Sequence, residues 1–235
     1  MNARLGLEKG EVRNIIAPVG EYKTIYCLST IKKYVEAGYN VMYYSIENNT
    51  SHIQQRLLDS GIRLGKAKPF FRTLPSLNLT ALRKQVEIDI NKIANVKLVI
   101  IEDINLLISD YIGMKSFLED ITCMLKSADI ACLFTTHAAK NYINGPINIE
   151  DIRHSAGAMH ICDTVYGIKS VKTSDKISFW QWLFNIFRNK KNRVKPNTEK
   201  SIYLSVLKNR YGESNQTCKL DVDEKKLEFN FKQAE

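Results

Sequence analysis

The stretch "VRNIIAPVGEYKT", residues Val12 to Thr24, joins an apolar run to a lysine–threonine pair. The run from Val12 to Ala17 predicts a buried strand, because apolar residues fill most of it. A helix that ends at Gly38 is predicted from the following "TIYCLSTIKKYVEAG". A loop that leaves a strand and enters a helix at Lys23 and Thr24 has the context of a phosphate-binding loop.

The loop keeps the side chains of a phosphate site but lacks two of the usual glycines. In such loops a lysine reaches the phosphates and the next hydroxyl binds Mg²⁺, jobs that Lys23 and Thr24 retain. Ala17 and Tyr22 stand where glycines are usual, so Tyr22 is expected to hold a glycine-like backbone at a cost of about 1 kcal/mol. Gly20 could supply some slack. These letters alone leave open a working site, an impaired one and a chance match.

Further apolar runs alternate with helical patterns, as in a parallel sheet with crossover helices. Strands are expected at 40–47, 96–103, 130–137, 163–171 and 201–210, helices at 51–61 and 113–128, and a closing hairpin at 217–231 that turns at Asp223 and Glu224. The sequence therefore predicts an α/β fold in one domain, residues 1–235, with a mostly parallel central sheet flanked by helices and a C-terminal β-hairpin.

Composition narrows the class of protein. The chain has 235 residues, of which 44% are hydrophobic and 25% charged, and these values are ordinary for a globular protein. It contains no apolar run long enough for a transmembrane helix and no signal peptide, so a cytoplasmic location is expected. The five cysteines are scattered and the four histidines unclustered. This pattern predicts reduced thiols and no zinc site.

The positive charge is concentrated in one segment. The net charge is +9, yet nine basic and two acidic residues between Lys169 and Lys200 account for +7 of it. Inside this region, residues 175–200 carry an apolar face at helical spacing followed by five basic residues. The apolar residues are Trp180, Leu183, Phe184 and Phe187.

The segment 175–200 allows four interpretations. It could dock a partner, such as another replication protein or a neighbouring subunit. It could lie on an anionic membrane surface, which is the least favoured of the four. Its basic half could follow nucleic acid while Trp182 stacks on bases. It could also pack its aromatic residues on its own domain.

Six stretches occur in a characteristic order: "GLEKGEVRNIIAPVGEYKT", "GYNVMYYSIENNTSHIQQRLL", "KLVIIEDINLL", "LFTTHAAKN", "DIRHSAGAMHICDTV" and "LKNRYGESNQT". They resemble the Walker A region, second strand, Walker B strand, sensor strand, channel loop and arginine-finger element of DnaB-type replicative hexameric helicases, especially bacteriophage members. The resemblance spans about Gly6 to Phe231, interrupted by 175–200. It implies a RecA-like P-loop fold.

This resemblance implies a site for ATP, or another nucleoside triphosphate, with Mg²⁺. The residues it assigns to the nucleotide and its metal are Gly20, Tyr22, Lys23, Thr24, Glu102 and Asp103. Glu102 falls at the Walker B position and would hold Mg²⁺ together with Thr24. Asp103 could substitute for it through a shift of one residue.

The resemblance also implies catalytic residues. Glu47 matches the glutamate that polarises the attacking water, and His137 matches the sensor of the γ-phosphate. Arg210, with Lys208, matches the finger that reaches the site of a neighbouring subunit, which requires a hexamer or another ring or filament. As plain polar residues, Glu47 would end a strand in solvent and Arg210 would belong to a turn.

Four residues are implied in binding single-stranded DNA. Arg153, His154 and Ala156 match a loop that lines the central channel, and Lys140 lies in a second channel loop. The chain is nearly neutral outside the basic segment, so DNA binding would rely on several subunits that each contribute a few contacts.

Two functions follow from these patterns. The first is a DnaB-like, phage-type helicase motor that couples nucleotide hydrolysis to movement on single-stranded DNA. The second is a helicase paralogue that has lost hydrolysis and acts as a DNA- or protein-binding accessory in replication or recombination. The altered loop favours the second, whereas the retained Glu47 and Arg210 favour the first.

Overall fold

The computed structural model describes residues 6–46, 49–73, 78–106, 111–138, 145–147, 160–174 and 198–232. The strands in these ranges are β1 (Val12–Ala17), β2 (Asn40–Ser45), β3 (Pro69–Thr73), β4 (Val96–Ile101), β5 (Ala131–His137), β6 (Thr164–Ser174), β7 (Thr198–Asn209), β8 (Gln216–Asp223) and β9 (Glu228–Phe231). The helices are α1 (Lys23–Glu36), α2 (Thr50–Asp59), α3 (Leu79–Lys92), α4 (Tyr111–Ser127) and the 3₁₀ turn η1 (Ile104–Leu106).

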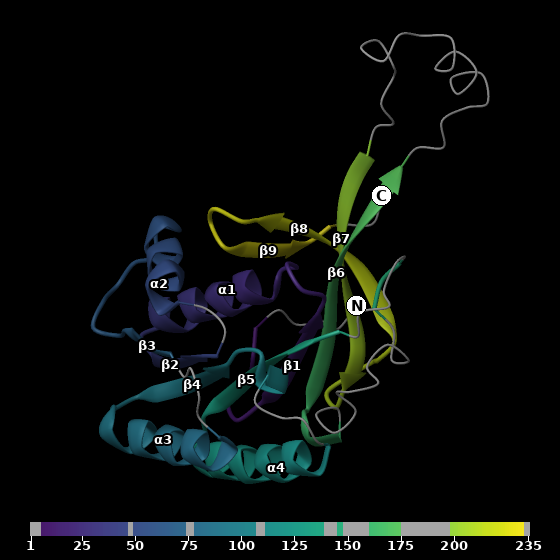
Figure 1. The fold of residues 1–235 in the computed structure, drawn as a ribbon. Helices are drawn as coiled ribbons and strands as arrows, with labels where there is room; N and C mark the ends of the chain where they lie inside the picture. Colours follow the sequence, from purple (N-terminus) through teal and green to yellow (C-terminus); the bar gives the residue numbers. More distant parts are fainter. Residues whose placement is uncertain are drawn as a thin grey trace, which may run out of the picture.

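All the described strands join one sheet in the order β3-β2-β4-β5-β1-β6-β7-β8-β9 (Figure 1). From β3 to β6 the neighbours are parallel, whereas β7, β8 and β9 are added in antiparallel pairs. The strands β1, β4 and β5 are adjacent and end at the same edge of the sheet. Because ligands of open parallel sheets bind beyond the carboxyl ends of the strands, this edge is where a site is expected.

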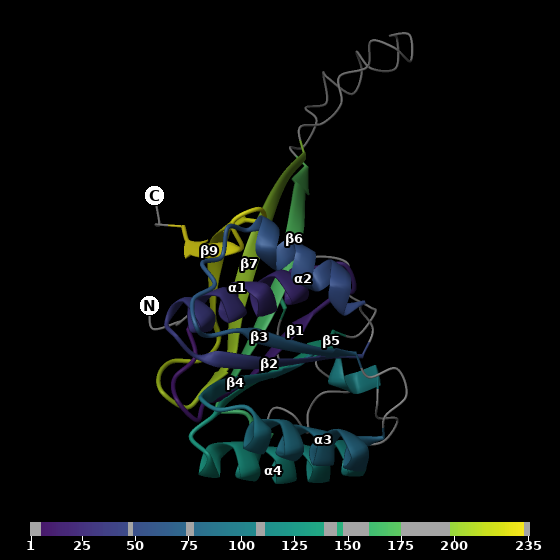
Figure 2. The ribbon, with the colours of Figure 1, turned by 90° about the vertical axis from the view of Figure 1, so that its left-hand side faces the viewer.

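Helices cover both faces of the sheet. Figure 2 shows α1 and α2 on one face and α3 and α4 on the other. Consecutive residues of β1 serve the two sides: Ile15 packs into the core beneath α1, and Ile16 into the core beneath α3 and α4. This double burial explains why β1 is an almost continuous apolar run.

The hairpin of β8 and β9 curls back over α1 (Figure 1). The ring of Phe229 meets that of Tyr26 edge to face, with centroids 5.5 Å apart. The antiparallel end of the sheet is therefore packed onto the helix that follows the loop 18–22.

The structure confirms the α/β class, the mostly parallel sheet flanked by helices and the closing hairpin. Three elements, β3, α3 and the 3₁₀ turn η1, were not predicted from the sequence. The segment 175–200 was also drawn too long, because residues 198–200 pair with 172–174 as part of β7. Its remainder, 175–197, lies outside the described residues. Among the helices of the described ranges, none is long and apolar enough to cross a membrane.

Candidate functional site

The loop between β1 and α1 does not place its residues as the sequence suggested. Gly20 has φ +77°, a left-handed conformation that favours glycine. Tyr22 has φ −70° and ψ 15°, values that any residue adopts without strain. The expectation that Tyr22 holds a glycine-like backbone is therefore wrong, because the turn that needs a glycine is made at Gly20.

Tyr22 is buried instead and has a packing role. Only 6% of the residue is exposed, and it belongs to the core beneath α1 together with Ala17 and Ile25. Tyr22 also precedes the first residue of α1, and the first N–H groups of a helix have no acceptor within the helix. The positive end of the helix dipole faces the loop, where the N–H of Lys23 donates to the carbonyl of Glu21.

Lys23 lies at the centre of a polar cluster, although it is almost fully buried. Its Nζ atom is 2.7 Å from Nδ1 of His137 and 3.5 Å from Oδ1 of Asp103. Since an ammonium only donates, Nδ1 of His137 accepts the hydrogen bond and the ring proton belongs on Nε2. That nitrogen is 3.4 Å from the same Asp103 oxygen, so the three side chains form a closed group.

Thr24 faces the second acid of the site. Its hydroxyl donates to Oε1 of Glu102 at 2.5 Å, and Glu102 has no exposed surface. The other carboxylate oxygen accepts from the hydroxyls of Tyr43 at 2.5 Å and Ser45 at 3.3 Å. Burial, and then the negative charge of Glu102, raise the pKa of Tyr43 well above its ordinary value, so the phenol stays a donor.

The turn after β4 separates the two acids. Glu102 still continues the sheet, because its N–H donates to the carbonyl of Tyr44 at 2.9 Å. Asp103 has φ +53°, which turns the chain away from the sheet, and its N–H donates to the hydroxyl of Thr135 at 2.8 Å. One acid therefore faces the threonine of the loop and the next faces the lysine and His137.

A cavity of about 320 Å³ opens above this cluster. Its lining includes six of the sequence-predicted residues: Gly20, Tyr22, Lys23, Thr24, Asp103 and His137. Four charged residues that were not predicted complete the lining: Glu21 of the loop, Arg56 of α2, Glu224 after β8 and Lys200 of β7. The volume is at the lower end of the range for small-molecule sites. The lining carries three cations, Lys23, Arg56 and Lys200, and three carboxylates, those of Glu21, Asp103 and Glu224.

Mg²⁺ would find oxygen ligands at Thr24 and Glu102. A hydroxyl and a carboxylate that already lie in hydrogen-bond contact fit the oxygen preference of this ion, which binds few protein ligands and keeps several waters. In the described ranges no three acidic, histidine or cysteine side chains gather as a metal cage. Thr24 and Glu102 therefore offer two oxygen ligands to such an ion.

Arg210 and Lys208 lie at the opposite edge of the sheet. The backbone N–H of Arg210 donates to Asp163, whose own N–H donates to Val12 at the start of β1. The guanidinium is 2.9 Å from the Asp163 carboxylate, and the Lys208 ammonium donates to a backbone carbonyl nearby. The length of β1, roughly 20 Å, therefore separates these cations from Lys23 of the same chain.

Five predicted residues lie outside the described residues. They are Glu47, Lys140, Arg153, His154 and Ala156. The strand that precedes Glu47 does reach the site, because β2 ends at Ser45, which contacts Glu102.

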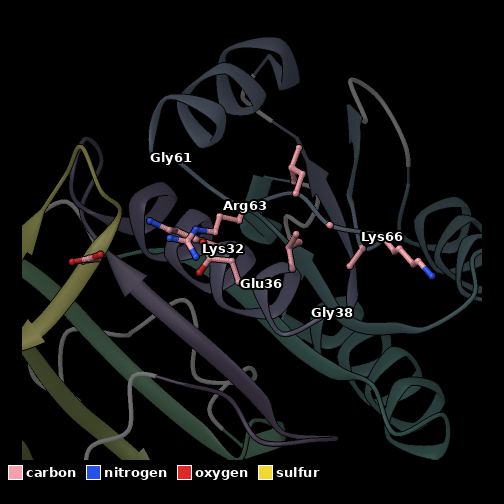
Figure 3. A pocket seen from close by; sticks show the side chains of 11 residues that line it. Lys32, Glu36, Gly38, Gly61, Arg63 and Lys66 are labelled. Atoms are coloured by element: carbon pink, nitrogen blue, oxygen red, sulfur yellow. The ribbon is translucent and has the colours of Figure 1, made fainter.

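A larger cavity, of about 910 Å³, lies beside the second half of α1 and residues 61–67 (Figure 3). Lys32, Arg63, Lys66 and Glu36 are among its lining residues, but none of the residues predicted for a site is. The ammonium of Lys32 donates to the carbonyls of Ser60 and Lys226, so it holds neighbouring loops together.

Several residues of the site were missed from the sequence: Tyr43 and Ser45, which contact Glu102, and Arg56 and Lys200, which line the small cavity. Tyr43 and Ser45 occupy the end of a predicted strand, where polar residues are a usable signal. Arg56 and Lys200 gave no such signal. No protein-family profile matches the chain, and no curated protein sequence matches it significantly. These comparisons therefore assign the chain to no family.

Proposed function

We propose that this chain is a RecA-like motor of the DnaB type, which binds a nucleoside triphosphate with Mg²⁺ and uses its hydrolysis to move along single-stranded DNA. The observation that carries the proposal is the convergence of Lys23, Thr24, Glu102, Asp103 and His137 at the carboxyl edge of β1, β4 and β5. These residues come from three separate stretches of sequence that each resemble a helicase motif.

Each side chain has a role in this proposal. When the nucleotide binds, the ammonium of Lys23 leaves Asp103 and His137 and contacts the phosphates. The imidazole of His137 then contacts the outermost phosphate. Thr24 and Glu102 hold Mg²⁺, which neutralises charge on the phosphates when it is bound. Glu47 follows the strand that ends beside Glu102, and it is proposed to orient the attacking water.

Arg210 is proposed to act on the site of a neighbouring subunit. Its position at the far edge of the sheet excludes contact with the cavity of its own chain and is what a residue acting in trans requires. The motor is therefore proposed to be a hexamer or another ring or filament. Lys140, Arg153, His154 and Ala156 are proposed to contact single-stranded DNA in its channel, in the host cytoplasm if the chain is encoded by a phage.

The second candidate is a paralogue that binds without hydrolysis. One observation favours it: the N–H of Lys23 donates to the carbonyl of Glu21 at 2.9 Å, and the N–H of Glu21 donates to Pro18 at 3.3 Å. Amides used inside the loop must be released before they can bind phosphate.

Phosphate release from ATP, with and without single-stranded DNA, separates the two candidates. The motor predicts turnover that DNA stimulates and that both Lys23→Ala and Arg210→Ala abolish. Turnover of the wild-type protein no higher than that of Lys23→Ala, with both proteins folded by circular dichroism, would overturn the motor and favour the binding paralogue.

A further inference from the structure

The paired strands β6 and β7 extend past their neighbours in the sheet (Figure 1), and one residue of β7 lines the small cavity. Lys200 is the third residue of β7 and pairs with Lys172 of β6. It lines this cavity together with Lys23. Its Nζ atom lies 4.9 Å from the centroid of the Tyr22 ring. At an exposed site a cation over a tyrosine face is held weakly, so it can be displaced.

The loop is also hydrogen-bonded, through Glu21, to the extended pair of strands β6 and β7, called the arm below. The Glu21 carboxylate accepts from the N–H of Ser170 at 3.1 Å and from its hydroxyl at 2.7 Å. Lys200 is opposite Lys172 on the neighbouring strand, two residues beyond Ser170. The position of the Lys200 backbone relative to the loop is therefore fixed by the sheet and by this tether.

The charges around the cavity leave room for another cation on a polyphosphate. Arg56 is paired with Glu224 at 3.5 Å, and Lys23 sits between Asp103 and His137. The tail of a nucleoside triphosphate carries several negative charges, more than Lys23 alone neutralises. A lysine ammonium on a flexible four-carbon stem can move from an aromatic ring to a phosphate oxygen without a change of backbone.

We propose that Lys200 is a second phosphate-binding residue of the nucleotide site, supplied by β7 of the same chain, and that it leaves the Tyr22 ring for the phosphate tail when nucleotide binds. The proposal rests on the proposed nucleotide site. If Lys200 binds phosphate, the arm of β6 and β7 forms one wall of the nucleotide site and contributes to the affinity for nucleotide.

The test is titration of a fluorescent ATP analogue, with Mg²⁺, into the wild-type protein and the variants Lys23→Ala, Lys200→Gln, Lys200→Arg and Lys84→Gln. Lys84 is an exposed residue of α3 on the far face of the sheet, so its variant removes the same charge away from the cavity. We expect Lys200→Gln to weaken binding roughly tenfold and to reduce its salt dependence, since charge-assisted hydrogen bonds contribute more than neutral ones. Lys200→Arg should retain most of the affinity.

Two results would overturn the proposal, and they differ in what else they overturn. If Lys200→Gln binds as the wild type does while Lys23→Ala does not, Lys200 only covers Tyr22 and the nucleotide site stands. If the wild-type protein itself binds no nucleotide, the role of Lys200 and the proposed function fail together. Equal weakening by Lys200→Gln and Lys84→Gln also counts against the proposal, because it shows an effect of net charge alone.

Discussion

Tyr22→Gly would restore the glycine that phosphate-binding loops carry before their lysine, and the structure predicts that it harms the protein. The Tyr22 side chain is almost fully buried in the core beneath α1, and its backbone needs no glycine. Removing a buried aromatic ring costs about 3–5 kcal/mol. The greater backbone freedom of glycine in the unfolded chain adds about 0.5–1 kcal/mol. The expected loss is therefore about 3.5–6 kcal/mol, which reaches the lower end of the stability of natural domains, about 5–15 kcal/mol.

Urea unfolding followed by circular dichroism measures this loss, and Gly20→Ala is the matched control. Gly20 has a positive φ, but a Cβ added there meets nothing within 4 Å. Its substitution should therefore cost only the local strain of about 1–3 kcal/mol. The reasoning is refuted if Tyr22→Gly changes the free energy of unfolding by less than 1 kcal/mol and binds nucleotide more tightly than the wild type.

Three more predictions follow. A mixture of Lys23→Ala and Arg210→Ala chains should regain hydrolysis that neither has alone, because some sites combine an intact lysine with an intact neighbouring arginine; no recovery in mixed oligomers counts against action in trans. Mg²⁺ should raise the nucleotide affinity of Glu102→Gln about tenfold less than it raises that of the wild type, as measured by titrations with and without Mg²⁺. Burial raises the pKa of Asp89, but hydrogen bonds led by that of Arg72 outweigh it and hold the pKa below 3.8. The stabilisation from the Asp89 carboxylate is therefore present above that pH and is lost as the pH falls through the lowered pKa. Asp89→Asn should lower the free energy of unfolding by about 2 kcal/mol near neutral pH. It should also reduce the loss of stability that the wild type shows at acid pH, measured by urea unfolding at several pH values.

The central strands were predictable because a strand that is buried on both faces of the sheet is a nearly continuous apolar run. β1 was predicted with the bounds that the structure has. The strand β3 was missed because "PFFRT" is short and half-buried, and α3 because only Leu82, Val86 and Asp89 of its residues are buried. So narrow a stripe gives a weak helical period.

The site residues were predictable where their position follows from the local order of strand, loop and helix. They were not predictable where their position depends on a turn of the chain. The positions of Lys23 and Thr24 follow from a strand that leads into a helix. The division of labour between Glu102 and Asp103 depends on a left-handed turn at Asp103, which the letters do not specify. The contact of Lys200 with the loop depends on pairing between distant strands, and pairing of that kind is not a local property.

The small cavity above Lys23, and not the larger one beside α1, is proposed to bind nucleotide. Titration of a non-hydrolysable ATP analogue into the wild type, Lys23→Ala and Lys32→Ala tests it most directly, because each variant removes one lysine from one cavity. The account predicts Mg²⁺-dependent binding that Lys23→Ala loses and Lys32→Ala keeps. Binding that survives Lys23→Ala, or that only Lys32→Ala removes, would contradict it.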